Sequence, residues 1–276
     1  MPASDSFPSR LFAMPSPKRA PALVRQATLL LTLSVLSGCS SRSPAESSGT
    51  CIQASYPEYD PAERVNRDIF AFNQVVDDYA IAPVARGYSH TPELFQQGMH
   101  NFTTNFGEPA VFVNDFLQGN GQRSLNTLGR FTVNTTAGLL GLIDVSDSLG
   151  IPRHTSDFGQ TFGVWGISDG PIVEMPLLGT ANSRDAVGRV INLAFNPFGD
   201  HSDTVKTLGT VDLVGGVIDQ RATLLPLTDV LKPLPDYYSA LRYLTARKRA
   251  DFVLEGKKGD AKPQQHHCEE ATTHAV

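Results

Sequence analysis

Apolar residues recur at helical spacing along most of the chain. Asp60-Pro61-Ala62-Glu63 has the form of a helix start, with Asp60 as N-cap and proline at the first helical position. The apolar stripe that follows advances by four, three, four and three residues: Val65, Ile69, Phe72, Val76 and Tyr79. A second helix is expected from Thr91-Pro92, and its stripe is Phe95, Met99, Phe102 and Phe106.

Further runs with helical periodicity cover 108–118, 123–134, 184–195, 203–225 and 236–253. Arg86 and Gly87 are expected in the turn after the first helix. No run shows sustained strand alternation. The pattern therefore predicts one all-α domain over 57–254, with glycine-rich irregular segments.

Residues 157–179, DFGQTFGVWGISDGPIVEMPLLG, interrupt the helical pattern. This run has too many glycines for a stable helix and is too irregular for a strand. A ligand-binding loop, a packed irregular segment and a surface against apolar material are the alternatives.

The run 136–145, TAGLLGLIDV, is apolar but far too short to span a bilayer. Gly138 and Gly141 make it a poor rigid helix. A short apolar hairpin with glycine joints is expected, and a tightly packed helical corner is the alternative.

The N-terminus has the order of a secretory signal. Basic residues precede the apolar stretch Ala27 to Leu36, which ends in the sequence LSGC. This ending resembles a bacterial lipobox, in which Cys39 is diacylated on sulfur and becomes the first residue of the mature chain. A free cysteine after an ordinary signal is the alternative, and Met14 is an alternative start. Residues 1–38 are thus predicted to be a lipoprotein signal peptide.

The flanks of the domain are polar. Residues 39–56 are expected to be the acylated cysteine and a flexible tether, and 255–276 a disordered tail. Cys51 and Cys268 lie in these flanks, and whether they pair stays open.

The charge of the chain argues against nucleic acid as a partner. The chain has 23 basic and 28 acidic residues. Removal of residues 1–38 takes away four basic residues and one acidic residue, which leaves 19 basic and 27 acidic residues and a net charge of −8. An acidic protein does not hold nucleic acid or an anionic lipid surface through bulk electrostatics. The lipid anchor is then expected to hold the protein at the membrane.

Residues with catalytic or metal-binding potential do not form a site. The chain contains no nucleophile elbow, P-loop or zinc-protease motif. His154-Thr155-Ser156-Asp157 is expected to be a loop with a helix cap, because sequence neighbours do not form a catalytic triad. His266-His267-Cys268 is at best a weak metal site. We therefore expect no enzymatic activity, no cofactor and no metal.

From Asp60 to about Gly256 the chain closely resembles the MlaA family, also called VacJ, of outer-membrane lipoproteins. The residues that carry the resemblance include Asp60-Pro61, Glu63, Asn66-Arg67, Phe70, Phe72-Asn73, Arg86-Gly87, Asn101-Phe102, Glu108-Pro109, Phe112-Val113-Asn114-Asp115, Leu117-Gln118-Gly119, Gly129-Arg130-Phe131, Asn134-Thr135, Gly138, Gly141, Asp144-Val145, Asp157-Phe158-Gly159-Gln160-Thr161, Gly163-Val164-Trp165-Gly166, Gly170-Pro171, Pro176-Leu177-Leu178-Gly179 and Arg184-Asp185. The C-terminal helix departs from the pattern at Tyr237, where the family commonly has proline.

The resemblance implies a ring of helices in the inner leaflet of the outer membrane, with an amphipathic channel and a trimeric porin as partner. Stray phospholipid would pass from the outer leaflet through the channel to a soluble periplasmic lipid-binding protein of the Mla pathway, and outer-membrane lipid asymmetry would be maintained. Ser40 after Cys39 resembles the signal for sorting to the outer membrane, on its periplasmic face. The alternative is a structural lipoprotein that supports porin or envelope assembly without lipid transfer.

The resemblance also suggests where lipid would pass. The first helix would line the channel with Asn66, Ile69, Phe70, Phe72 and Asn73, although the same residues suit helix packing equally well. The apolar hairpin would act as a gate opposite 70–73, through Gly138, Leu139, Leu140, Gly141, Leu142 and Ile143. The resemblance implies that residues 157–179 form a close-packed segment, in which glycine lets backbones approach one another. Trp165 is expected either at the membrane interface or in the core.

The lipobox makes a direct prediction. Substitution of Cys39→Ser should abolish labelling by radioactive palmitate and release the protein from membranes, because a stable anchor needs two or more acyl chains. Labelling that persists in this variant would show that another residue is acylated.

Overall fold

The computed structural model describes residues 59–195, 198 and 202–259. Contacts divide the chain into 1–52 and 53–276, and every described residue belongs to the second unit. The expected signal peptide, Cys39, Cys51 and Cys268 lie outside the described residues. The elements are α2 (Glu63–Val76), the π-helix η1 (Asp77–Ile81), α3 (Ala82–Ser89), α4 (Glu93–Leu117), α5 (Gly121–Thr136), α6 (Val145–Ser148), α7 (Phe158–Val164), β1 (Ile172–Met175), β2 (Gly179–Asn182), α8 (Ser183–Ala194), α9 (Asp203–Leu231) and α10 (Tyr237–Lys258).

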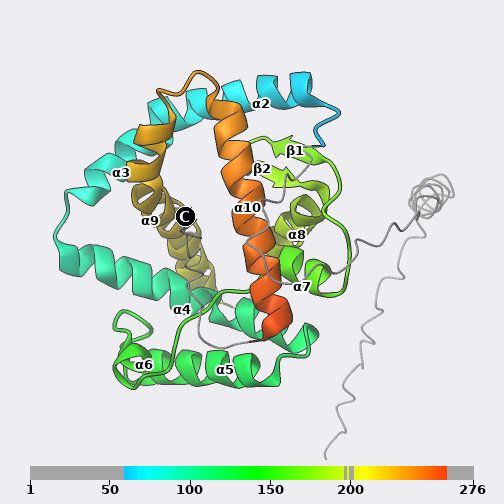
Figure 1. The fold of residues 1–276 in the computed structure, drawn as a ribbon. Coiled ribbons are helices and arrows are strands. Elements are labelled where there is room, and N and C mark those ends of the chain that lie inside the picture. Colours follow the sequence, from blue (N-terminus) through cyan, green and yellow to red (C-terminus); the bar gives the residue numbers. More distant parts are fainter. Residues whose placement is uncertain (1–58, 196–197, 199–201, 260–276) are drawn as a thin grey trace, which may run out of the picture. The chain divides into compact units, whose positions relative to one another are not determined.

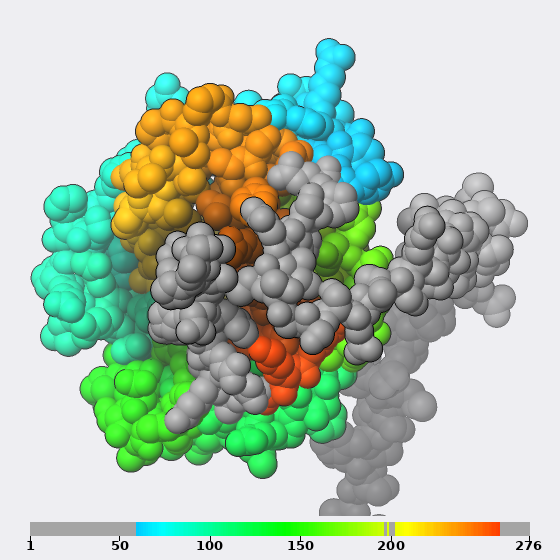
Figure 2. Space-filling model, in the orientation of Figure 1, coloured from blue at the N-terminus to red at the C-terminus, as the bar shows by residue number. Residues whose placement is uncertain are grey.

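The prediction of an all-α fold is confirmed, with one short hairpin added. Helix α4 packs against both α5 and α9, α3 packs on α9, and α7 packs against both α8 and α10 (Figure 1). The hairpin β1–β2 contacts α2, α8 and α10. In the space-filling view of Figure 2, atoms of α2 to α5, cyan to green, border the face on which α9 and α10 lie.

Asp60 does not cap the first helix, as the sequence suggested. Helix α2 begins at Glu63, and its N-cap residue Ala62 provides no side-chain hydrogen bond. The Asp60 carboxylate instead accepts hydrogen bonds from Tyr238 Oη at 2.6 Å and Arg242 Nη1 at 2.7 Å. The Asp60 carboxylate is therefore paired with Arg242 of α10 and does not cap α2.

The predicted apolar stripe, which runs from α2 into η1, lies mainly on the outer side, with Ile69 and Val76 half-buried. Val65, Phe72 and Tyr79 are exposed, whereas Asn66 and Phe70 are buried. The helix is amphipathic as expected, but its polar asparagine lies on the inner side.

Two of the expected boundaries are wrong. The separate helices from Thr91 and over 108–118 form one helix, α4, which continues through Pro109. Packing of α4 on both α5 and α9 holds this helix together despite the cost of an internal proline. Arg86 and Gly87 lie within α3, with Pro83 near its start, rather than in a turn.

Residues 157–179 are more regular than expected. Asp157 accepts a hydrogen bond from the Gln160 amide at 2.7 Å and caps α7, which confirms the predicted loop with a helix cap. Strands β1 and β2 then pair antiparallel, with Ile172 opposite Asn182. Each strand has only four residues, too few to show an alternating pattern. The predicted tail also starts too early, because α10 continues to Lys258.

Helices α7 and α8 meet through two glycines. A Cβ atom on Gly188 would lie 2.7 Å from the Cα atom of Gly159, so no side chain fits there. Gly129 in α5 has no heavy atom within 4 Å of its Cβ position. A side chain therefore fits at Gly129 of α5 but not at Gly188 of α8.

Substitution of Gly188→Ala should destabilise the fold by about 1 to 3 kcal/mol, because the helices must move apart. Gly129→Ala should instead stabilise it by up to about 1 kcal/mol through helix propensity. Urea unfolding of both variants in detergent tests this, and equal midpoints would contradict the close packing of α7 on α8.

Candidate functional site

The interior of the described unit is largely polar, and much of its surface is apolar. The largest fully buried side chains include those of Arg123, Arg130, Gln160, Asn114 and Asn134. Large apolar side chains are exposed on most helices, among them Val65, Phe72, Val75, Leu125, Leu139, Trp165, Val190, Leu193, Val214 and Val230. Exposed apolar area of this extent marks a surface that contacts something apolar. Within the described residues, none of the helices has both the length and the apolar character needed to cross a membrane.

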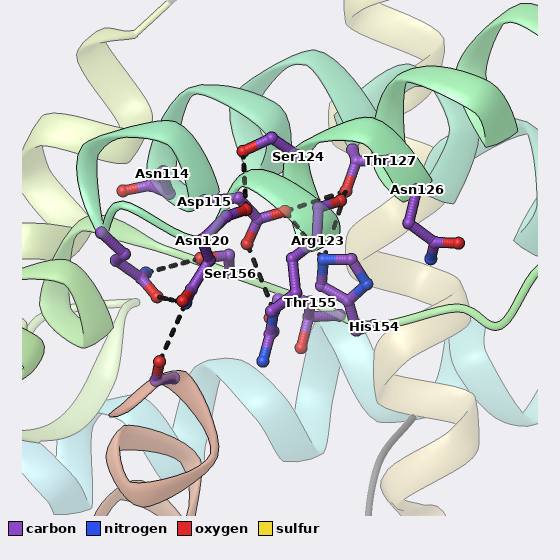
Figure 3. Close-up of polar contacts among 12 residues, drawn as sticks. Asn114, Asp115, Asn120, Arg123, Ser124, Asn126, Thr127, His154, Thr155 and Ser156 are labelled. Carbon is purple, nitrogen blue, oxygen red and sulfur yellow. Dashed lines mark hydrogen bonds and ion pairs between the residues drawn. The ribbon is translucent and has the colours of Figure 1, made fainter. Parts of the chain in front are cut away.

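Asp115, near the end of α4, is the centre of a buried network at the α4–α5 corner (Figure 3). One carboxylate oxygen accepts hydrogen bonds from His154 Nε2 at 2.7 Å and from Thr127 Oγ1 at 2.9 Å. The other oxygen lies 3.5 Å from Arg123 Nε, and both side chains of this ion pair are fully buried. Loss of either partner would remove this ion pair from the interior and leave the remaining charge less well compensated.

Arg123 extends this network to the end of α10. Its Nη2 donates to the Thr155 carbonyl at 2.9 Å, and its Nη1 donates to Glu255 Oε1 at 3.3 Å. Nearby, Asn120 Nδ2 donates to the Gly256 carbonyl at 2.9 Å. The α4–α5 corner, the segment before α7 and α10 are thus joined by polar contacts.

Arg130 forms a second buried junction. Its Nε lies 3.2 Å from Glu108 on α4, and its Nη2 lies 2.7 Å from Asp144, the N-cap of α6. Burial raises the pKa of Glu108, and the charge of Arg130 opposes this effect. Burial also acts to raise the pKa of Asp144, but hydrogen bonds from Arg130 and Asn134 bring it below its usual value.

Arg249 on α10 joins α7 and α8. Its Nη1 and Nη2 donate to the two carboxylate oxygens of Asp157 at 2.7 and 3.0 Å, and its Nε donates to Asp185 at 2.8 Å. Asp185 also accepts from Arg184 Nε at 2.9 Å. Desolvation would raise the pKa of Asp185, but hydrogen bonds from Arg249 and Arg184 lower it. The carboxylate is therefore ionised and paired.

The asparagines expected to line a channel hold the β-hairpin. Asn66 is buried; its Nδ2 donates to the Ile172 carbonyl at 3.1 Å, and its Oδ1 accepts from the Glu174 amide at 3.0 Å. Asn73 donates to the Met175 carbonyl at 3.0 Å and accepts from the Leu177 amide at 2.8 Å. Both amide groups make structural hydrogen bonds, which favours the packing interpretation of these residues.

The apolar residues of α2 divide between the interior and the surface. Phe70 is buried, with its ring centroid 5.4 Å from that of Tyr237 and 5.3 Å from that of Tyr238. Ile69 is half-buried, and Phe72 is exposed. Only Phe72 of this group is well placed to contact a ligand directly.

The connection between α5 and α6, residues 137–144, is a tight turn with an apolar surface. Leu139 and Leu140 have φ values of 54° and 60°, and Gly141 has 91°. A left-handed conformation costs a non-glycine residue of order 1 kcal/mol, and surrounding structure must hold it. The side chains of Leu139 and Leu140 are 63% and 61% exposed, and those of Leu142 and Ile143 are also exposed.

This connection packs on α4. Asn101 Nδ2 donates to the Leu142 carbonyl at 3.3 Å, and a Cβ on Gly141 would lie 2.5 Å from Asn105 Cβ. In Figure 1, α2 and α6 lie at opposite ends of the unit. The turn therefore lies on the side of the unit away from 70–73, and its role as a gate stays a prediction. Gly138, whose Cβ position is filled by the Ile143 carbonyl, closes the turn.

Trp165 lies at the end of α7, and its side chain is exposed. Trp165 is 55% accessible to solvent, and its indole Nε1 donates to the Leu117 carbonyl at 3.0 Å. The interpretation of Trp165 as a core residue is wrong. An exposed indole with a satisfied N–H agrees with a position beside an apolar phase.

The sequence did not reveal the buried charges. Arg123, Thr127, Arg130 and Asn134 advance by four, three and four residues, and all four are buried. A polar stripe at helical spacing normally marks the water-facing side of a helix. The polar stripe of α5 was visible in the sequence, but only the exposed apolar residues of the structure show that this stripe faces the interior.

Comparison with known proteins supports the resemblance noted from the sequence. The family model described as MlaA lipoprotein matches residues 58–251. The chain belongs to the MlaA lipoprotein family. An uncharacterised protein of Rickettsia felis is 36% identical over 198 residues, which cover 71% of this chain and 78% of that protein.

Two relatives have informative names. The intermembrane phospholipid transport system lipoprotein MlaA of Escherichia coli K12 is 34% identical over 88% of this chain and 93% of its own. The Haemophilus influenzae protein of the same name is 28% identical over 85% of this chain and 92% of its own. A solved structure, described as "Structural basis for maintenance of bacterial outer membrane lipid asymmetry", has a TM-score of 0.61 and 31% identity, over 70% of this chain and 98% of that one.

The Arg249 junction predicts a large difference between two neighbouring arginines. Arg249→Met should destabilise the fold by about 3 to 5 kcal/mol, because Asp157 would lose its arginine partner and buried Asp185 would keep only Arg184. Arg247→Met removes an exposed guanidinium of the same helix and should change stability by less than about 0.5 kcal/mol. Thermal or urea unfolding in detergent measures both. Equal, small effects would show that the buried ion pairs do not hold the helices together.

Proposed function

We propose that this protein is an outer-membrane lipoprotein that removes mislocalised phospholipid from the outer leaflet and passes it to a periplasmic carrier. The observation that carries the proposal is the combination of an apolar exterior with an interior in which the buried arginines are ion-paired. Such a surface is stable in contact with lipid, and ion pairing lowers the cost of the buried charges. The chain belongs to a family with relatives named for intermembrane phospholipid transport, and this supports phospholipid as the transported molecule.

The physical task of such a protein is to carry a headgroup past hydrocarbon. An unpaired charge in an apolar medium costs several kcal/mol or more, so a lipid moves between leaflets only beside polar protein groups. The exposed Phe72 and the leucines of residues 137–144 would contact acyl chains, and Trp165 would lie at the membrane interface. Gly138 and Gly141 keep the apolar turn compact against α4.

Localisation and partners follow from the same proposal. Cys39 would carry the acyl chains that hold the protein at the periplasmic face of the outer membrane. A trimeric porin would give access to the outer leaflet, and a soluble lipid-binding protein of the Mla pathway would receive the lipid. The protein would act without a cofactor and without chemistry on the lipid.

Deletion of the gene tests this function. Phospholipid that is accessible to an added phospholipase at the cell surface should rise in the deletion strain and return to its original level with the wild-type gene. Complementation with Arg247→Met should be as effective as wild type, whereas Cys39→Ser should not restore asymmetry. Unchanged surface phospholipid in the deletion strain, together with loss of porin complexes, would favour a purely structural lipoprotein instead.

A further inference from the structure

Arg189 is the exception among the buried and half-buried arginines of the described chain. The others lie within 4.0 Å of a carboxylate, namely Arg67, Arg123, Arg130, Arg153, Arg184, Arg221, Arg242 and Arg249. Half-buried Arg189 makes a single hydrogen bond, from Nη1 to the Leu178 carbonyl at 2.6 Å. Its Nε and Nη2, the two donors along one edge of the guanidinium, have no partner within the described residues.

The carboxyl groups nearest to Arg189 have other partners. Arg189 is one helical turn beyond Asp185 on α8, and both Asp185 and Asp157 are paired with Arg249. Buried Glu174 accepts from Thr180 Oγ1 at 2.5 Å and from Asn73 Nδ2 at 2.7 Å. A positive charge on α8 therefore has no counter-ion of its own.

This charge is in an unfavourable environment as it stands. Desolvation lowers the pKa of Arg189, and the neighbouring charge of Arg249 lowers it further; Asp185, Asp157 and Glu174 act in the opposite direction. A partly desolvated guanidinium gains more from an anion than one in bulk water. Its free edge suits the two oxygens of a phosphate or carboxylate.

Exposed apolar side chains lie around the same position. Arg189 is anchored to the β1–β2 turn, in which Leu177 and Leu178 are exposed. Val190 and Leu193, the next residue and the residue one turn further on α8, are also exposed. A ligand with a single anionic group next to apolar chains matches this combination.

We propose that Arg189 binds the phosphate diester of a phospholipid through Nε and Nη2, while the leucines of the β1–β2 turn contact the glycerol and acyl region. The inference rests on the proposed function and assigns a headgroup contact to it. A phosphate group could also come from inorganic phosphate, so the test must separate the two sources.

Full-length protein in detergent should be mixed with dioleoylphosphatidylglycerol, or with dioleoylglycerol, which has the same acyl chains without phosphate. Native mass spectrometry counts the retained lipid. Wild type should retain the phospholipid at least about 10-fold more than dioleoylglycerol, since the pairing is charge-assisted and bidentate. Arg189→Gln should lose this preference, and Arg189→Lys, which keeps the charge without the fork, should retain part of it.

Arg247→Gln is the matched control, because it removes an exposed cation from α10 and should bind as wild type does. Equal phospholipid retention by Arg189→Gln and wild type would overturn the role of Arg189 and leave the proposed function intact. Failure of wild type to retain any phospholipid would count against the proposed function itself. Inorganic phosphate that binds lipid-free wild type but not Arg189→Gln, with lipid retention unchanged, would assign the site to free phosphate and overturn the lipid contact. Circular dichroism of Arg189→Lys and Arg189→Gln establishes that both fold.

Discussion

A buried guanidinium must be paired with an anion, and this requirement joins the helices of the protein. Arg123 and Arg130 on α5 reach Asp115 and Glu108 on α4, and Arg249 on α10 reaches Asp185 on α8. Each pair connects two helices, so the ion pairs take the place that aliphatic side chains have in a water-soluble bundle. The same pattern recurs at other junctions, with Arg242 of α10 on Asp60 and Arg221 of α9 on Asp77 of η1.

A polar interior leaves the apolar residues for the surface. In water this arrangement would be costly, since each exposed leucine or valine forgoes about 1.5 to 3 kcal/mol of burial. The arrangement becomes favourable when the outside is lipid, where apolar side chains lose nothing. It also explains how a protein without a membrane-crossing helix among its described residues offers so much apolar area to its surroundings.

The sequence predicted the helices well and their orientation poorly. The period of 3.6 residues located α2, α5, α8, α9 and α10 because it depends on backbone geometry alone. It did not show which face is inside: Val65 and Phe72 point outward, and Asn66 points inward. That assignment depends on the surrounding solvent, which the pattern does not encode. Asp60 was misassigned for a related reason, since its partner Arg242 is far away in the sequence.

The conformations of two apolar turns, residues 137–144 and the β1–β2 turn, were also not predictable from the sequence. Gly138 and Gly141 correctly marked a turn between α5 and α6, but the left-handed leucines between them and the packing on α4 depend on tertiary contacts. The β1–β2 turn, with Leu177 at a φ of 64°, was hidden in a glycine-rich run. In both turns an asparagine side chain is hydrogen-bonded to the backbone, as donor from Asn101 and as acceptor at Asn73, and leucines remain exposed.

The orientation of the apolar surface can be measured with Trp165, the single tryptophan of the chain. Protein reconstituted into vesicles of brominated phosphatidylcholine, with bromine at a shallow or a deep acyl position, should show strong fluorescence quenching by the shallow bromine. Iodide in the aqueous phase should quench it weakly. Strong quenching by iodide with no effect of either brominated lipid would contradict the claim that the exposed apolar residues contact lipid.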